Sequence, residues 1–295
     1  MHLMHLMHRS VAIAYCALIP SLGQSQVPTK SPVSTSGANA VTILNSFGYV
    51  RVEGWDRDSV SAVDSASGGL TIRRDAPGEI HINPPRDGFG GNVARSDIFV
   101  RVPRNVRVHV DGHQTKVDIV GVTGRVDVDV GVEGDVKISG NPSEVNVDAR
   151  GSDIELQVTT PYLRAMGASG RIRWTGSSDD VLLSTVTGGI TIQAGTVGRG
   201  RFETTSGDMH FRGGITSHAS IVFETHSGDI TADFVKGTEA DVIVSGSITD
   251  VFGTHSTGPT DPARNGSTEH RLGTKHDAVV TLRSFSGRVT TTLQP

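Results

Sequence analysis

A regular nine-residue spacing of apolar residues constrains the fold of this chain more than any other feature. In the segment GRVDVDV, the valines alternate with charged residues, which is the two-residue period of a strand with one buried face. The first inward residues of successive strand-like segments lie nine residues apart, with one step of ten, at Val108, Val117, Val126, Val136, Val145, Ile154, Leu163, Ile172, Val181 and Ile190. The spacing continues less regularly to Ile248. A repeat of this kind predicts an all-β repeat architecture.

A second regularity shows that the structural unit contains two strands. Small residues, mostly glycine, stand two positions before every other inward residue, in steps of 18 to 21, at Gly134, Ser152, Gly170, Gly188, Gly207, Gly228 and Gly246. The strands between them carry varied residues at this place, such as Pro161 and Asp179. One corner of each turn therefore favours glycine, as expected where the backbone needs a positive φ or approaches a neighbour closely.

These two patterns predict a single-domain parallel β-solenoid, similar to a β-helix, with two strands in each turn of 18 to 21 residues. Each strand would pair with its counterpart one turn away, about 4.8 Å distant. An antiparallel β meander or sandwich also alternates two kinds of turn and is the alternative. The glycine starts a strand instead of occupying a two-residue hairpin loop, which favours the solenoid.

The first 39 residues have the composition of an export signal and a leader. Arg9 ends a polar start, and the apolar run from Val11 to Leu22 is shorter than the roughly 20 residues that span a bilayer. We expect a signal peptide over 1–25, a flexible leader over 26–39 and the folded domain over 40–295, with no transmembrane span in the mature chain. The alternative is a buried N-terminal helix in a cytosolic protein. Cys16, the single cysteine, would leave with the signal.

The end of the repeat is interrupted. Residues 253–277 lack periodicity and are rich in Gly, Pro, Ser and Thr, so we expect an irregular loop insertion there. The strand pair AVVTLRSFSGRVTTTL follows and is expected to form the terminal rung. A solenoid must protect its open ends, and we expect the stretch around Trp55 and the final strand at Leu293 to act as caps.

Several motifs, in order along the chain, carry a family resemblance. They are NSFGYVRVEGWDRDSV, DIFVRVPRNVRVHVDG, TSGDM, THSGDI and RSFSGRVTT. Together they resemble the bacterial "putative adhesin" family of unknown function over residues 41–295. The resemblance implies an exported β-strand repeat protein of the cell envelope or extracellular space and brings no active site. The chain departs from the family pattern in the loop after Phe252 and at Arg171 and Arg288, which replace the Asp of a Gly-Asp pair.

Acidic residues and histidines are the candidates for metal binding. Four aspartates follow the glycine-favouring corner, at Asp135, Asp153, Asp208 and Asp229. Adjacent turns would bring such carboxylates together, as calcium requires, but the column is broken at Arg171, Gly189 and Ser247 and aspartate is common beside a turn glycine. The histidines are His109 and His113 around Asp111, and His255, His270 and His276 near the late loop. Their spacing does not predict zinc, so no metal or cofactor residue is expected.

Paired carboxylates are the candidates for catalysis, since parallel β-helices also house polysaccharide-cleaving enzymes. Asp127 and Asp129 alternate with inward valines and should form a solvated strand face, and Asp179 and Asp180 lie at a corner. Neither pair is accompanied by a basic cluster or an aromatic platform. No catalytic residue is therefore predicted.

Charge and composition narrow the partner class. The net charge is −4, with both signs interspersed, so the chain lacks a basic stripe for nucleic-acid phosphates. We expect a secreted or cell-envelope, non-catalytic repeat protein that serves in adhesion or as a scaffold and contacts an envelope protein or a polysaccharide. A glycan-processing β-helix enzyme is the alternative.

Overall fold

The computed structural model describes residues 33–34, 38–66, 69–76, 78–84, 95–257, 267–275 and 277–294. Within these ranges the regular structure is all strand, and no helix is long and apolar enough to cross a membrane. The expected signal peptide at 1–25 and most of the expected leader at 26–39 lie outside the described residues.

The strands follow one another with short connections. They are β1 (Val33–Ser34), β2 (Ala40–Trp55), β3 (Ser59–Asp64), β4 (Thr71–Ala76), β5 (Glu79–Asn83), β6 (Ser96–Pro103), β7 (Arg107–Val120), β8 (Arg125–Glu133), β9 (Val136–Gly140), β10 (Glu144–Ala149), β11 (Ile154–Val158), β12 (Thr160–Gly167), β13 (Ile172–Thr185), β14 (Ile190–Thr204), β15 (Met209–Thr225), β16 (Ile230–Phe234), β17 (Ala240–Ser245), β18 (Ile248–Val251), β19 (Thr254–Thr257), β20 (Thr268–Leu272), β21 (Val279–Ser284) and β22 (Arg288–Leu293). The longest ones bend through a corner and contribute to two sides of the molecule.

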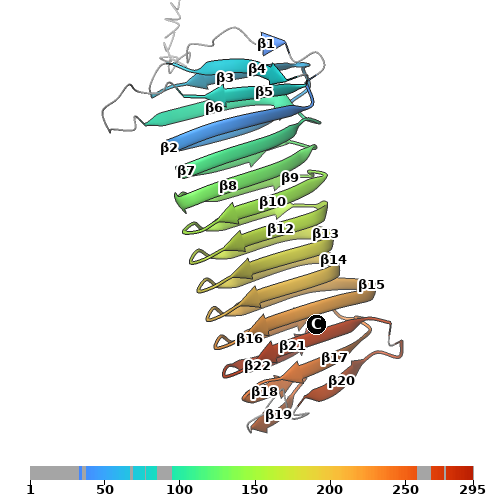
Figure 1. Cartoon of the computed structure of the whole chain (residues 1–295). Helices are drawn as coiled ribbons and strands as arrows, with labels where there is room; N and C mark the ends of the chain where they lie inside the picture. Colours follow the sequence, from blue (N-terminus) through green and yellow to red (C-terminus); the bar gives the residue numbers. More distant parts are fainter. Residues whose placement is uncertain are drawn as a thin grey trace, which may run out of the picture.

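The middle of the chain forms a parallel, solenoid-like stack of rungs (Figure 1). Val145 of β10 pairs with Val126 of β8 on one side and with Leu163 of β12 on the other, so that each strand contacts its counterpart one turn earlier and one turn later. On the opposite side of the stack, β11 lies in the same way between β9 and β13. The expected all-β architecture with parallel pairing is confirmed for this region.

A simple solenoid does not describe the two ends, where rung order departs from chain order. At the start, β2 lies between β7 and the rung formed by β5 and β6. At the other end, β21 pairs with β15 and β17, and β22 pairs with β16 and β18. Figure 1 shows this last strand pair inserted between β15–β16 and β17–β18. After β16 the chain therefore forms the outer rung, β17 and β18, first. The last strands, β21 and β22, then occupy the position between that rung and β15–β16.

This topology corrects the expected terminal rung and caps. The final strand is internal, with Leu293 opposite Phe234 of β16, and therefore does not cap the stack. Trp55 ends β2, one rung inside the outermost one, and its indole N–H donates to the Ser59 carbonyl at 2.8 Å. The first rung in the chain, β2, is thus covered by β5 and β6, and the last rung in the chain, β21 and β22, is covered by β17 and β18.

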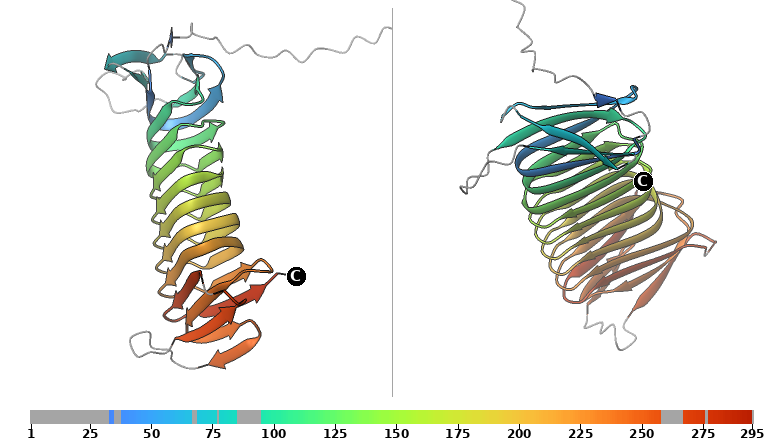
Figure 2. Two further views of the ribbon diagram at one scale, coloured as in Figure 1. Left: turned by 90° about the vertical axis from the view of Figure 1, so that its right-hand side faces the viewer. Right: turned by 45° about the horizontal axis from the view of Figure 1, so that its top comes forward.

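Antiparallel strands cover the outermost rungs instead. In the described residues, every antiparallel pair involves β1, β3, β4, β19 or β20. They leave the regular stack at its two ends (Figure 2). β19 and β20 belong to the interval 253–277, which was expected to be irregular and instead supplies strands at both of its sides. Pairing with the edges of β17 and β18 explains them, because an open edge leaves backbone donors and acceptors unsatisfied.

The inward side chains form one hydrophobic core that changes along the stack. Aliphatic side chains fill the rungs up to β11, large aromatic side chains join them from β13 to β16, and the rungs of β17, β18, β21 and β22 are again aliphatic. Phe202 and Phe223 stack with ring centroids 4.8 Å apart, and Phe211 contacts Phe223 and Phe234 at 5.5 and 5.6 Å. These rings pack against one another across rungs, since they come from β14, β15 and β16.

Close backbone approach is the reason for the glycine-favouring corner. An added Cβ at Gly188 would lie 1.8 Å from the Gly170 carbonyl oxygen, and one at Gly207 would lie 1.9 Å from that of Gly188. Neither residue has a positive φ. Of the two reasons considered from the sequence, contact between rungs is thus the one that applies at these positions.

Candidate functional site

Buried hydroxyls shape the glycine corners of the later rungs. Each accepts a hydrogen bond from the glycine N–H three residues on, in the pairs Thr185 to Gly188, Thr204 to Gly207, Thr225 to Gly228 and Ser284 to Gly287. Each also donates to the glycine carbonyl one rung earlier, as Thr204 does to Gly188 at 3.2 Å. The side chain that follows each hydroxyl residue is thereby directed outward.

A shallow groove of about 510 Å³ runs along these corners over four rungs. Its outward column consists of Ser184, Glu203, Glu224 and Arg283, which are successive partners on neighbouring strands. Its other wall is formed by the exposed residues after the hydroxyls, namely Val186, Thr205, His226 and Phe285. Strands far apart in the chain meet here, because β21 is inserted beside β15.

A stacked pair of rings ends the groove. The rings of His226 and Phe285 are 4.8 Å apart and only 7° from parallel, and Phe285 is 61% exposed. Hydrogen bonds from the amide and hydroxyl of Ser286 to the His226 carbonyl tie the two corners together. A large aromatic surface held open to solvent in this way is suited to stacking against a flat ligand.

Two charged side chains in the groove are unpaired. Glu224 and Arg283 are exposed partners on adjacent strands, and within the described part of the chain neither forms a side-chain hydrogen bond or ion pair. Glu203, in contrast, is bound by Arg201. Most outward charges in earlier rungs are paired across rungs, for example Arg199 with Asp180 at 2.8 Å. The groove thus offers a free acceptor and a free donor beside an aromatic surface.

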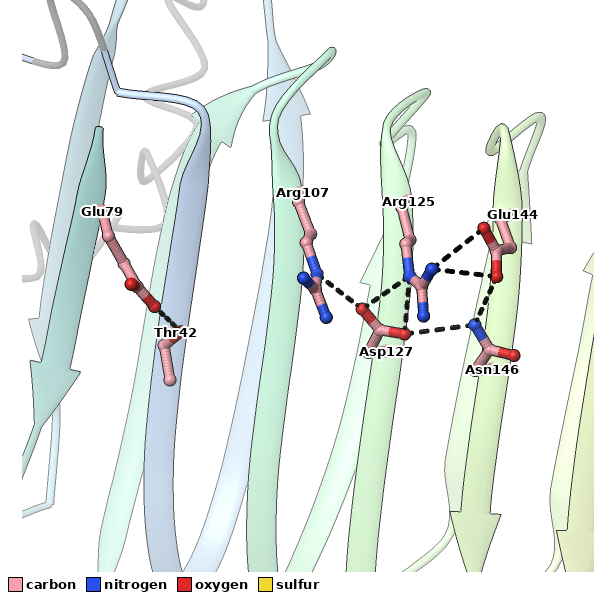
Figure 3. A network of polar contacts seen from close by, with 7 residues as sticks. All are labelled: Thr42, Glu79, Arg107, Arg125, Asp127, Glu144 and Asn146. Carbon is pink, nitrogen blue, oxygen red and sulfur yellow. Dashed lines mark hydrogen bonds and ion pairs between the residues drawn. The ribbon is translucent and has the colours of Figure 1, made fainter. Parts of the chain in front are cut away.

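The predicted solvated face at Asp127 and Asp129 is present at Asp129, which is exposed, but not at Asp127. Asp127 is only 8% exposed and lies within a network that spans three rungs (Figure 3). Its carboxylate accepts hydrogen bonds from Arg107 at 2.8 Å and from Arg125 at 2.9 Å, and Asn146 adds a third at 3.1 Å. Burial alone would raise the pKa of Asp127, but the hydrogen bonds from the two arginines outweigh it and lower the pKa.

Asp129 occupies the next outward position and has the opposite tendency. Burial raises its pKa, His109 opposes this, and the like charges of Asp148 and Asp111 on the adjacent rungs raise it further. No group of three or more ligand-type side chains in the described residues is arranged to hold a metal ion. The network around Asp127 is structural, since its charges satisfy one another.

The corner aspartates bind the backbone of the next rung. Asp208 accepts the N–H of Asp229 at 2.9 Å, and Asp229 accepts that of Arg288 at 2.7 Å. Asp153 accepts both the N–H and the guanidinium of Arg171, and these bonds outweigh burial and lower its pKa. Asp135 forms an ion pair with Lys116 at 3.4 Å. These carboxylates join rungs together and are not collected around a common point.

The remaining candidates are dispersed. His109 is half-buried and His113 is exposed on β7, and neither belongs to a cluster of three or more ligand-type side chains in the described residues. His270 lies on β20 with its ring 6.4 Å from that of Phe252, and the side chains of His255 and His276 are outside the described residues. Asp180 pairs with Arg199, whereas Asp179 is exposed at the variable corner.

A second hollow, of about 280 Å³, lies near the N-terminal end. Its lining includes Phe99 and three charged side chains. Arg51 binds Glu53 at 2.9 Å, and Arg101 lies 3.4 Å from the same carboxylate. Because these charges are already paired with one another, this hollow offers a ligand less than the corner groove does.

Comparisons with known proteins identify one family and a few solved structures. A family model described as Toastrack DUF4097 matches residues 35–291. No curated protein matches the chain. A putative cell adhesion protein from Clostridium sporogenes has 12% identity and a TM-score of 0.26, with 90% of this chain and 100% of that chain covered.

Two structures from Parabacteroides distasonis are also similar. A putative lipid binding protein has 12% identity and a TM-score of 0.43, with coverage of 89% and 96% of the two chains. A putative adhesin has 13% identity and a TM-score of 0.37, with coverage of 90% and 96%. Such TM-scores are too low to assign a ligand.

Proposed function

The chain belongs to the Toastrack DUF4097 family, and from this premise we propose that it is an exported, non-catalytic binding protein of the bacterial envelope or cell surface. The observation that carries the proposal is the pairing of charges along the stack. Acidic residues that could have served chemistry, such as Asp127 and Asp153, are occupied by arginines of neighbouring rungs. The outer surface of the stack is therefore a long array of polar side chains that repeats from rung to rung. Such an array is suited to binding another extended surface.

Export is the part of the proposal that rests on the sequence. The polar start ending at Arg9 and the short apolar run after it are typical of a signal peptide, and 26–39 would then link it to the domain at 40–295. A mature chain without cysteine is stabilised by its rung-to-rung hydrogen bonds and core and needs no disulfide. Adhesion or scaffolding is the role that follows from such a surface.

A glycan-processing enzyme is a second candidate because two carboxylates share the groove. Glu203 and Glu224 are partners on adjacent strands. Glycosidases place their two carboxyl groups on either side of the scissile bond. Here both glutamates project from the same face of one sheet, and the Glu203 carboxylate is already occupied by Arg201. Binding without cleavage is the better-supported function.

The test combines localisation, binding and turnover. The full chain is expressed in bacteria, cells are fractionated, and the exported protein is titrated onto isolated cell envelopes while released reducing sugar is measured. We expect recovery outside the cytoplasm, saturable binding and no release of sugar. Cytoplasmic retention or absence of binding would overturn the proposal, and sugar release that is lost in Glu224→Gln would replace it with the enzyme.

A further inference from the structure

The inserted C-terminal rung completes the corner groove. Glu224 lies at the end of β15 and His226 just after it, whereas Arg283 lies at the end of β21 and Phe285 just after it. The contact exists because the second half of β15 pairs with β21, and β17, which comes earlier in the chain than β21, lies on the far side of β21. The hydroxyl and amide of Ser286 and the amide of Phe285 then bond to the carbonyls of His226 and Thr225. A free charge pair and a ring pair are thus joined on a rigid framework.

We propose that this groove is the binding site of an extended, neutral saccharide chain; the inference rests on the proposed binding function. A sugar ring has an apolar C–H face that packs on an aromatic ring, and the exposed Phe285, supported from behind by His226, supplies such a ring. Sugar hydroxyls both donate and accept hydrogen bonds. Arg283 supplies several donors and Glu224 supplies acceptors within one rung of the ring pair.

The charges of the groove favour a neutral ligand over an acidic or basic one. Glu203 is neutralised by Arg201, and Glu224 and Arg283 carry opposite charges on adjacent strands. A polyanion would meet the carboxylates of Glu203 and Glu224, and a polycation would meet the guanidinium of Arg283, which lines the groove. Because the outward column repeats with the strand spacing of about 4.8 Å, a chain lying along the stack would meet a new polar side chain at each rung.

Binding to an array of linear neutral oligosaccharides, with acidic oligosaccharides beside them, tests the inference. The probe is the full exported protein. We expect binding to at least one neutral series, with an affinity that Phe285→Ala lowers roughly tenfold. Phe285→Trp should retain binding, and Arg283→Gln and Glu224→Gln should each weaken it. Phe99→Ala removes another exposed aromatic side chain, 40% exposed and away from the groove, and should leave binding unchanged.

The outcomes separate this inference from the proposed function. Absence of binding to every neutral oligosaccharide, or equal losses in Phe285→Ala and Phe99→Ala, would overturn the groove as a saccharide site. The same result with intact, saturable binding to cell envelopes would leave the proposed function standing. Loss of both kinds of binding in the wild-type protein would overturn both. Phe285 is exposed, so an unchanged thermal melt is expected for its variants and is measured beside each titration.

Discussion

At the scale of the residue, adjacent side chains in a strand have opposite environments. Val128 is 2% exposed and points into the core, whereas Asp129 is exposed on the outer face of β8. Val128→Asp would place an unpaired charge among apolar side chains, which costs several kcal/mol. We expect this variant to unfold or aggregate, as seen in a thermal melt.

Asp129→Asn is the matched control for that variant. The raised pKa of Asp129 means that its charged form is less favourable in the folded state, so the neutral amide should give equal or slightly greater stability at neutral pH. The difference should disappear below the ordinary pKa of 3.8, where both side chains are uncharged. Equal losses of stability in the two variants would contradict the inward and outward assignment.

At the scale of the element, the corners hold the rungs at their spacing. The glycine corner brings two backbones into direct contact, and the threonine three residues earlier satisfies the buried N–H of that glycine, as in Thr185 and Gly188. The corner is therefore a repeated hydrogen-bonded unit. Its geometry also decides which side chain faces the groove.

Two adjacent glycines test this explanation. A Cβ at Gly188 would lie 1.8 Å from a backbone oxygen of the previous rung, whereas one at Gly189 would lie 3.2 Å from the nearest atom. We expect Gly188→Ala to lower the free energy of unfolding by about 3 kcal/mol or more, as severe overpacking does, and Gly189→Ala to cost less than about 1 kcal/mol. Denaturant titrations measure both, and similar losses would contradict the close-approach explanation.

Local patterns explain why the elements were predictable and the rung order was not. Alternation around Val126 and the spacing of the corner glycines predict strands and parallel stacking, because both depend on residues within one or two turns. The pairs β17–β18 and β21–β22 have the same local pattern of apolar residues, so the sequence does not indicate which of the two pairs lies next to β15.

The corner groove could not be predicted from the sequence for the same reason. His226 and Phe285 are the variable residues of short corner motifs, and their contact depends on the insertion.

At the scale of the whole molecule, the two ends are built alike. The first rung, β2, is covered by β5 and β6, and the last rung, β21 and β22, is covered by β17 and β18. Antiparallel strands then pair with the outermost edges, which prevents growth of the stack by edge pairing. Neither chain-terminal rung can separate from the stack without breaking pairs on both of its sides. The same insertion forms the candidate saccharide site.

Cysteine cross-linking tests the insertion directly, in a Cys16→Ser background that removes the single native cysteine. Thr231 of β16 is the direct partner of Thr290 on β22, and Thr290 is in turn the partner of Asp250 on β18. Mass spectrometry under mild oxidation should detect a disulfide in Thr231→Cys with Thr290→Cys. It should detect none in Thr231→Cys with Asp250→Cys, where two strand spacings, roughly 10 Å, exceed the reach of a disulfide. The reverse result would show that the rungs follow chain order and that His226 and Phe285 do not form a common site.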